Sequence, residues 1–259
     1  MRRTLILPVL VLAAGLLASC GKGTLTVTSG QVSAGRSGTT TSGSSSPSTA
    51  PGGPTPSKQR AVTFARAVNL TAADVPGFAA TQKQHSSSGS EKQLERQMLR
   101  CAGLSGAAKA VAEESSQSFR LKHQIVDLTV SSEVAVESSA AQAQKALSAI
   151  RSSHVRGCFT RYLQQTLAGQ QAKGATPGPV TIQSGTPPAP GMSGSFGWRV
   201  TARFDVRGIK VPIYLDFLGF VDGPSQVTLL SSGLLQPFPA AAQQHLFSLL
   251  LARARAHKL

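Results

Sequence analysis

The clearest pattern in the chain is an alternation of apolar and polar residues near its C-terminal end. Apolar side chains occupy every second position over residues 198–206 and again over 209–217, with an Arg-Gly pair at 207–208 between the two segments. A period of two places the apolar side chains on one face of a β-strand, and a two-residue connection fits a hairpin turn. A second turn at 222–224 leads into a further segment over 226–232. We therefore predict a three-stranded antiparallel meander.

A similar alternation occupies residues 119–136. Valine and leucine side chains take most of the alternate positions from 126 onward, and the residues between them are polar, including Asp127 and Glu133. This pattern predicts one strand, or two strands joined at a kink near Ser131-Ser132. Its polar face is expected to be exposed to solvent, as is common in antiparallel sheets.

Segments with helical spacing lie around these strands. Ser90 is a favourable N-cap for a helix that carries Cys101 on its apolar face, and Ser139 caps a second helix that runs to about residue 167 and carries Cys158. Pro239 opens a final helix. The stripe that packs on the sheet is expected at Ala242, Leu246, Leu249, Leu250 and Arg253. Smaller predicted elements are a capped turn at 71–74, a helical piece over 107–112 and a strand over 180–183.

Together these elements predict an α+β fold in which helices cover an antiparallel sheet. A single domain is expected over residues 60–259. Before it, residues 21–59 consist mainly of Gly, Ser, Thr and Pro, with almost no large apolar side chains after Val32. Such a composition buries too little apolar area to offset the entropy of ordering. We therefore expect a flexible tether over 20–59, with a reach on the order of 35 Å.

The first 20 residues have the pattern of an export signal. Arg2 and Arg3 precede an apolar core over 5–17, which is short for a membrane span, and Leu-Ala-Ser-Cys follows at 17–20. This segment resembles the lipobox of bacterial lipoprotein signal peptides. The resemblance implies removal of residues 1–19 and lipid, of the diacylglyceryl and palmitate type, on Cys20, so that the chain is held at the extracytoplasmic face of the cell membrane. An ordinary secretory signal or an N-terminal transmembrane helix is the alternative.

Two of the three cysteines remain once Cys20 is assigned to the lipid. Cys101 and Cys158 form an even pair in an oxidising compartment, so we predict a disulfide between them that links two helices. The alternative is a reactive or metal-binding thiol at Cys158, with His154 one helical turn away. Metal sites need three or four ligands, and the sequence has no Cys-x-x-Cys or His-x-x-x-His spacing to supply them.

The combination of these features resembles a known family. The lipobox, the tether, the half-cystines Cys101 and Cys158, the strand-to-helix segment over 132–143 and the final meander with its helix are similar to actinobacterial extracytoplasmic lipoproteins and kinase sensor domains with a PsbP-like fold. The resemblance implies a PsbP-like fold and an extracytoplasmic location. Its motifs are architectural and imply no catalytic residues. Sensor domains of that kind often carry two disulfides, whereas this chain has cysteines for one.

The charge of the chain points to anionic partners. Without residues 1–19 the chain has 24 basic and 11 acidic side chains, a net charge of +13. Such an excess favours phospholipid headgroups or anionic envelope polymers, and the predicted location argues against nucleic acid. The basic residues are scattered along the sequence, however, so the alternative is that they only keep the surface solvated.

Motifs of enzymes are missing from the sequence. It contains no Gly-x-Ser-x-Gly hydrolase elbow, P-loop, dinucleotide-binding glycine pattern or His-Glu-x-x-His zinc motif. Asp205 and Asp216 are the one candidate acid/base pair, but neighbouring Arg and Lys residues favour a salt-bridged sheet face. We therefore expect a non-catalytic binding or sensor-like module for an apolar small ligand, lipid or envelope protein, with no cofactor or metal. An enzyme acting on cell-envelope components is the alternative.

Overall fold

The structure, a computed structural model, describes residues 55–81, 93, 96–98, 100–103, 110–168, 176–206 and 208–259. Its helical elements are α1 (Lys58–Val68), the 3₁₀ turn η1 (Ala72–Asp74), α3 (Ala140–Arg151), α4 (Ser153–Ala168) and α5 (Ala240–Ala256). Its strands are β1 (Ala79–Thr81), β2 (Ala112–Ser115), β3 (Ser118–His123), β4 (Val126–Val136), β5 (Thr176–Gly185), β6 (Gly194–Val206), β7 (Ile209–Asp222) and β8 (Ser225–Leu234).

The strands form one antiparallel sheet. Seven of them follow the order β1-β3-β4-β8-β7-β6-β5, and β2 pairs with β4 beside this path. The predicted meander is confirmed as β6, β7 and β8, with Trp198 opposite Phe217 and Phe217 opposite Leu230. Gly208 has a φ of 82°, a conformation that favours glycine, at the turn between β6 and β7.

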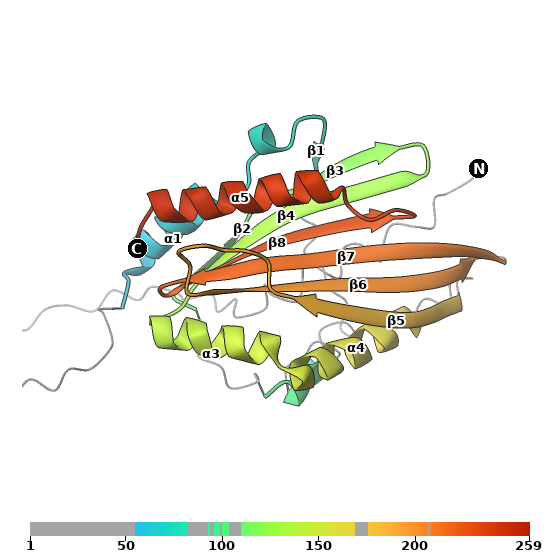
Figure 1. Ribbon diagram of the computed structural model, residues 1–259, viewed down its shortest axis with the longest axis horizontal. Helices are drawn as coiled ribbons and strands as arrows, with labels where there is room; N and C mark the ends of the chain where they lie inside the picture. Colours follow the sequence, from blue (N-terminus) through green and yellow to red (C-terminus); the bar gives the residue numbers. More distant parts are fainter. Residues whose placement is uncertain are drawn as a thin grey trace, which may run out of the picture.

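Helices cover both faces of the sheet, so the α+β prediction is confirmed (Figure 1). On one face α1 and α5 pack on β4, β7 and β8 around a core that includes Phe64, Phe220 and Leu250. On the other face α3 and α4 pack on β5 to β8 around Leu147 and Phe159. The described helices include none that is long and apolar enough to cross a membrane.

Two strand predictions were wrong in detail. The turn between β3 and β4 lies at Gln124-Ile125, and β4 runs without a break through the expected kink at residues 131–132. The polar face of β4 is also not solvent-exposed, because Asp127 and Glu133 are only 4% and 6% exposed. Asp127 is instead paired with Arg120 of β3. The alternation of residues assigned the two faces of β4 correctly, but it did not reveal that residues on both faces are buried.

Helix predictions also required correction. The helix expected from Ser139 is two helices, because Ser152 ends α3 and its side-chain Oγ accepts the Val155 N–H at the start of α4. In α5, Leu246 and Leu250 are buried as predicted, but Ala242 is exposed. The buried face of α5 is therefore rotated about the helix axis relative to the predicted stripe, and Gln243 and Phe247 are buried. Ala112, expected at the end of a helical piece, begins strand β2, and residues 104–109 lie outside the described residues.

The predicted disulfide between Cys101 and Cys158 is confirmed. Cys101 lies in a helical segment and Cys158 in α4, with their Cα atoms 5.8 Å apart. Cys158 packs with Ala102 and Val155 in a small core of its own. The bond therefore ties the segment near residue 101 to the helical layer of α3 and α4.

Replacing both cysteines with alanine should lower the free energy of unfolding by about 4 kcal/mol, because the bond closes a loop with a sequence separation of 57. The measurement is urea unfolding of a chain in which Cys20→Ser removes the third thiol. The same chain under reducing conditions is the control and should match the double variant. A loss below about 1 kcal/mol would contradict the expected role of the bond.

Candidate functional site

A groove lies between α5 and the loop that joins β5 to β6. Its volume is about 410 Å³, within the usual range of roughly 300 to 1,000 Å³ for small-ligand sites. One wall is formed by loop residues Pro187, Pro188 and Pro190. The other wall is α5, and Leu218 of β7 completes the lining. In Figure 1 this loop passes beside α5 at the end of the sheet where α5 finishes.

The proline-rich loop is held in place by contacts of its carbonyl groups. Ser195 Oγ donates a hydrogen bond to the Pro187 carbonyl at 2.5 Å, and the Arg255 guanidinium donates to the Pro190 carbonyl. Prolines have no backbone N–H, so their rings present apolar surface without unsatisfied donors. The Arg255 contact also joins the loop to α5. The two walls of the groove are therefore linked at one end.

A buried network of hydrogen bonds determines which face of α5 points toward the sheet. Asp216 of β7 is only 3% exposed and receives two hydrogen bonds from the Arg199 guanidinium, at 2.7 and 2.9 Å. Gln243 of α5 donates to Asp216 at 3.2 Å and to Ser231 Oγ at 2.6 Å. The hydrogen bond to Asp216 raises the pKa of Arg199, so this partner remains a cation. Gln243 thus packs against the sheet, and Phe247 and Leu251 on the same side of α5 line the groove.

A second polar contact holds the far end of α5. Arg253 donates to both carboxylate oxygens of Asp74, at 2.7 and 2.9 Å, and to the Asn69 carbonyl at 2.9 Å. Burial alone would raise the pKa of Asp74, but the hydrogen bonds from Arg253 and Thr71 outweigh it and leave the pKa below its ordinary value. The Asp74 carboxylate is therefore ionised when it pairs with Arg253.

The described lining of the groove contains few polar groups. Its polar lining from α5 consists of Gln243, Gln244, Ser248 and Arg255, and the remaining described lining is apolar. Arg255 is the one ionisable side chain among these residues, and no carboxylate, histidine or thiol is present to act as a base or nucleophile. What the groove offers is apolar surface with a cation at its edge.

The residues predicted as sites from the sequence lie elsewhere. Cys20 is outside the described residues. Cys101, His154 and Cys158 do come together, with their ligand-type atoms all within 4.8 Å of one another. Both sulfurs are consumed by the disulfide, and His154 Nε2 lies 2.6 Å from the Cys101 carbonyl oxygen. This cluster therefore lacks the three free ligands that a metal would need.

Asp205 and Asp216 do not form an acid/base pair. Asp216 lies opposite Arg199 and binds it, whereas Asp205 lies opposite Lys210 at the other end of the hairpin. Asp205 Oδ1 accepts the Gly208 N–H at 2.6 Å, which stabilises the turn. The sequence correctly favoured a salt bridge for Asp216. It did not indicate Gln243, because a glutamine within an apolar helix stripe gives no periodic signal.

A group of three acidic residues, of which Glu133 is buried and the other two are half-buried, lies on the sheet face away from α1 and α5. Glu113 of β2 and Glu133 of β4 are diagonal neighbours in the register of these strands, and Glu137 follows β4. Burial raises the pKa of Glu113, the hydrogen bond with Glu133 opposes the rise, and repulsion from Glu137 adds to it. Burial also raises the pKa of Glu137. Glu113 Oε1 has no hydrogen-bond partner among the described residues.

These carboxyls should make the protein less stable as the pH rises. Their folded-state pKa lies above the unfolded value, so the folded state binds more protons in the interval between the two. The free energy of unfolding therefore falls as pH increases through that interval. We expect Glu113→Gln to raise stability at pH 7 and to reduce the loss of stability as the pH rises above the ordinary glutamic acid pKa of 4.5, as measured by urea unfolding.

Glu114→Gln is the matched control for this prediction. Glu114 is the next residue on β2 and pairs with Arg66 on the opposite face of the strand, so the variant makes the same change in charge outside the acidic group. It should keep the pH dependence of the unmodified chain. If Glu113→Gln and Glu114→Gln showed the same dependence on pH, burial of Glu113 would not be its cause.

Comparison with solved protein structures gives one match. No known family model matches the sequence, and no curated protein matches it. The extracellular domain of PknH from Mycobacterium tuberculosis is similar over 78% of this chain and 98% of that domain, with 11% sequence identity and a TM-score of 0.32. A TM-score this low does not establish a shared fold, so the likeness assigns neither fold nor function to this chain.

Proposed function

We propose that the chain is an extracytoplasmic lipoprotein whose domain is a non-catalytic binding module for an apolar ligand. In this proposal, lipid on Cys20 holds the protein at the cell membrane and the groove beside α5 takes the ligand. The disulfide between Cys101 and Cys158 supports an oxidising location outside the cytoplasm. It does not bear on the lipid itself, which rests on the resemblance of residues 17–20 to a lipobox.

The lining of the groove is the observation that carries the proposal. Three prolines, Leu218, Phe247 and Leu251 gather around one hollow of about 410 Å³. Transfer of apolar ligand surface from water into such a hollow is favourable by roughly 25 cal/mol per Å². Arg255, the one ionisable side chain in the described lining, already binds the Pro190 carbonyl. Acid, base or nucleophilic chemistry on a ligand would need carboxylate, histidine or thiol groups, which the described lining does not contain, whereas retention of an apolar ligand needs none of them.

Filling the groove should weaken binding of an apolar probe. Ala252 lines the groove and is exposed, so Ala252→Trp introduces a large side chain without disturbing the core. We expect this variant to bind the neutral dye Nile red about tenfold more weakly than the unmodified chain, a difference of about 1.4 kcal/mol. Fluorescence titration measures the change.

Ala242→Trp is the control for this experiment. Ala242 is exposed on the same helix but does not line the groove, so the variant adds the same apolar surface elsewhere. It should bind the dye as the unmodified chain does. Equal affinity of all three proteins, or no measurable binding by the unmodified chain, would refute the groove as the binding site.

A further inference from the structure

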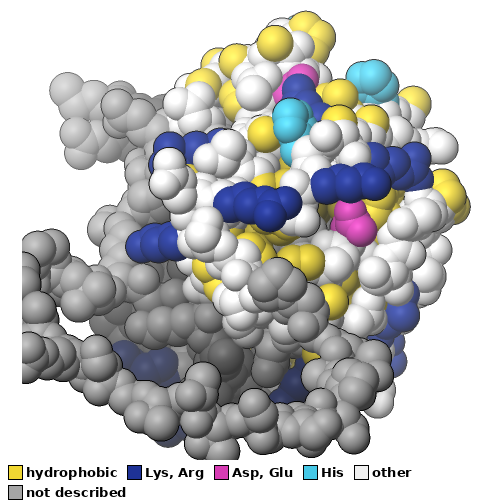
Figure 2. Space-filling model, turned by 90° about the vertical axis from the view of Figure 1, so that its left-hand side faces the viewer, with side chains coloured by type: hydrophobic (Ala, Val, Ile, Leu, Met, Phe, Trp, Pro, Cys, Tyr) yellow, Lys and Arg dark blue, Asp and Glu magenta, His cyan; other side chains and the backbone are white. Residues whose placement is uncertain are grey.

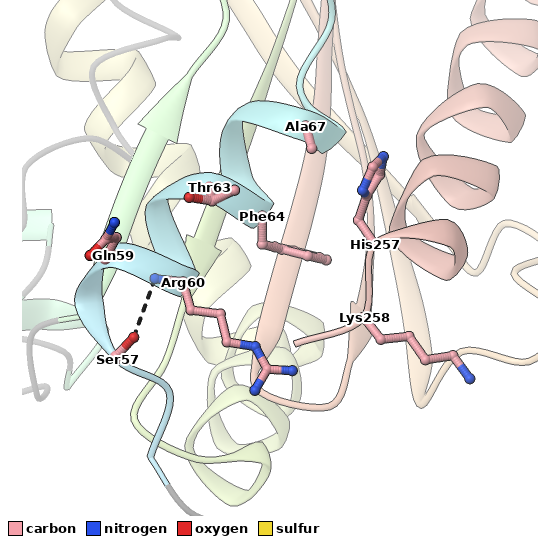
Figure 3. A pocket seen from close by; sticks show the side chains of 8 residues that line it. All are labelled: Ser57, Gln59, Arg60, Thr63, Phe64, Ala67, His257 and Lys258. Atoms are coloured by element: carbon pink, nitrogen blue, oxygen red, sulfur yellow. Dashed lines mark hydrogen bonds between the residues drawn. The ribbon is translucent and has the colours of Figure 1, made fainter.

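A cluster of Lys, Arg and His side chains occupies the end of the domain where α1 begins and α5 finishes. Lys58 and Arg60 lie in the first turn of α1, and His257 and Lys258 follow α5. We refer to these four residues as the basic end. Three of them, Arg60, His257 and Lys258, line one hollow of about 410 Å³ together with Phe64. Figure 3 shows Arg60 reaching from α1 beneath the Phe64 ring, toward the chain segment that carries His257 and Lys258.

The lysine and arginine side chains of the basic end have no carboxylate partners among the described residues. Described Asp and Glu side chains pair with other arginines, namely Arg66, Arg120, Arg199 and Arg253. Lys58, Arg60 and Lys258 form no such pair and are all exposed. Figure 2 looks onto this end of the molecule, where Lys and Arg side chains gather and few acidic ones appear. Among the described residues, this part of the surface therefore carries Lys and Arg charges that no carboxylate neutralises.

Helix stability does not account for two of these charges. The N-terminus of a helix carries a partial positive charge, so cations in the first turn are unfavourable and acidic residues are favoured there. Helix α1 has no acidic residue in its first turn and has Lys58 and Arg60 in it. Lys258, by contrast, suits the C-terminal end of α5. A requirement outside the helix explains the placement of Lys58 and Arg60 better than folding does.

The point at which the chain enters the domain bears on which anion would lie near the basic end. The described residues begin at Thr55, two residues before the N-cap Ser57 of α1. The segment between Cys20 and this point has a composition typical of a tether, and a coil of that length spans on the order of 35 Å. If Cys20 carries lipid, the basic end is thus the part of the domain attached directly to the tether. Its charge complements anionic phospholipid headgroups, which attract Lys and Arg by about 1 kcal/mol each, or roughly fivefold in affinity.

We propose that the basic end docks the domain on the anionic phospholipid headgroups of its membrane. This inference goes beyond the proposed function, because it concerns the orientation of the domain and does not require the groove to bind a ligand. Docking at this end points the opposite end of the sheet away from the membrane (Figure 1). At that opposite end, Ile125 lies in the β3–β4 turn and Ile209 begins β7 just after the β6–β7 turn, and these side chains are 71% and 67% exposed.

Vesicle flotation of residues 20–259 with Cys20→Ser tests the proposal without a lipid anchor and without the apolar segment over 5–17, which would enter vesicles by itself. The chain should bind vesicles that contain phosphatidylglycerol and should not bind vesicles of phosphatidylcholine alone. Replacing Lys58, Arg60 and Lys258 with glutamine should weaken binding about 100-fold, from roughly fivefold per cation. Binding should also fall as salt concentration rises, because the surface potential is screened.

The matched control removes the same charge from the opposite end. Lys122, Arg203 and Lys210 are exposed and lie near the β3–β4 and β6–β7 turns. Their replacement by glutamine should leave vesicle binding nearly unchanged. Circular dichroism and thermal unfolding of both triple variants establish that each is folded.

Three outcomes would overturn the proposal. Equal weakening by the two triple variants would assign binding to net charge alone. If the control variant weakened binding more, the opposite end of the sheet, with Ile125 and Ile209, would be the part that contacts the membrane. Failure of the unmodified protein to bind anionic vesicles, even if it bound a soluble anionic polymer such as polyphosphate, would exclude headgroups as the partner. Dye binding in the groove is measured separately and is not affected by any of these results.

Discussion

The hydrogen bond between Gln243 and Asp216 sets the position of α5, and the candidate site depends on that position. Asp216 is a buried charge, and leaving such a charge without its partners is strongly destabilising. Arg199 of β6 supplies the countercharge, and Gln243 of α5 supplies a further hydrogen-bond donor. Burying a glutamine requires α5 to turn its polar residue toward the sheet, which places Phe247 and Leu251 along the groove.

The same helix connects the groove with the charged end of the domain. Arg253 is neutralised by Asp74, so its charge serves the attachment of α5 to the 3₁₀ turn after α1. Arg255 binds the proline-rich loop, and Lys258 has no ion-pair partner among the described residues. Three neighbouring cations therefore differ in role because their partners differ. Net charge alone, which the sequence provides, does not distinguish a structural cation from one available for binding.

Sequence patterns predicted those parts of the fold that are governed by local periodicity. The meander of β6, β7 and β8 was found because its residues alternate, and the disulfide because the cysteine count and the export signal agree. The break at Ser152 and the rotation of α5 were missed, because they depend on capping and on a partner from a distant strand. The groove could not be predicted, since its walls are far apart in sequence and meet only through the packing of α5. The lipid on Cys20 stays a prediction, because that residue lies outside the described part of the chain.

Native mass spectrometry of the protein isolated from its own cell envelope tests the central claim most directly. If the domain is a binding module, a fraction of the folded protein should carry an additional small mass, and that mass should be released on unfolding. The released molecule should be predominantly apolar, in keeping with the proline, leucine and phenylalanine lining of the groove. Recovery of the folded protein with no bound small molecule, under conditions that retain other non-covalent complexes, would contradict the account.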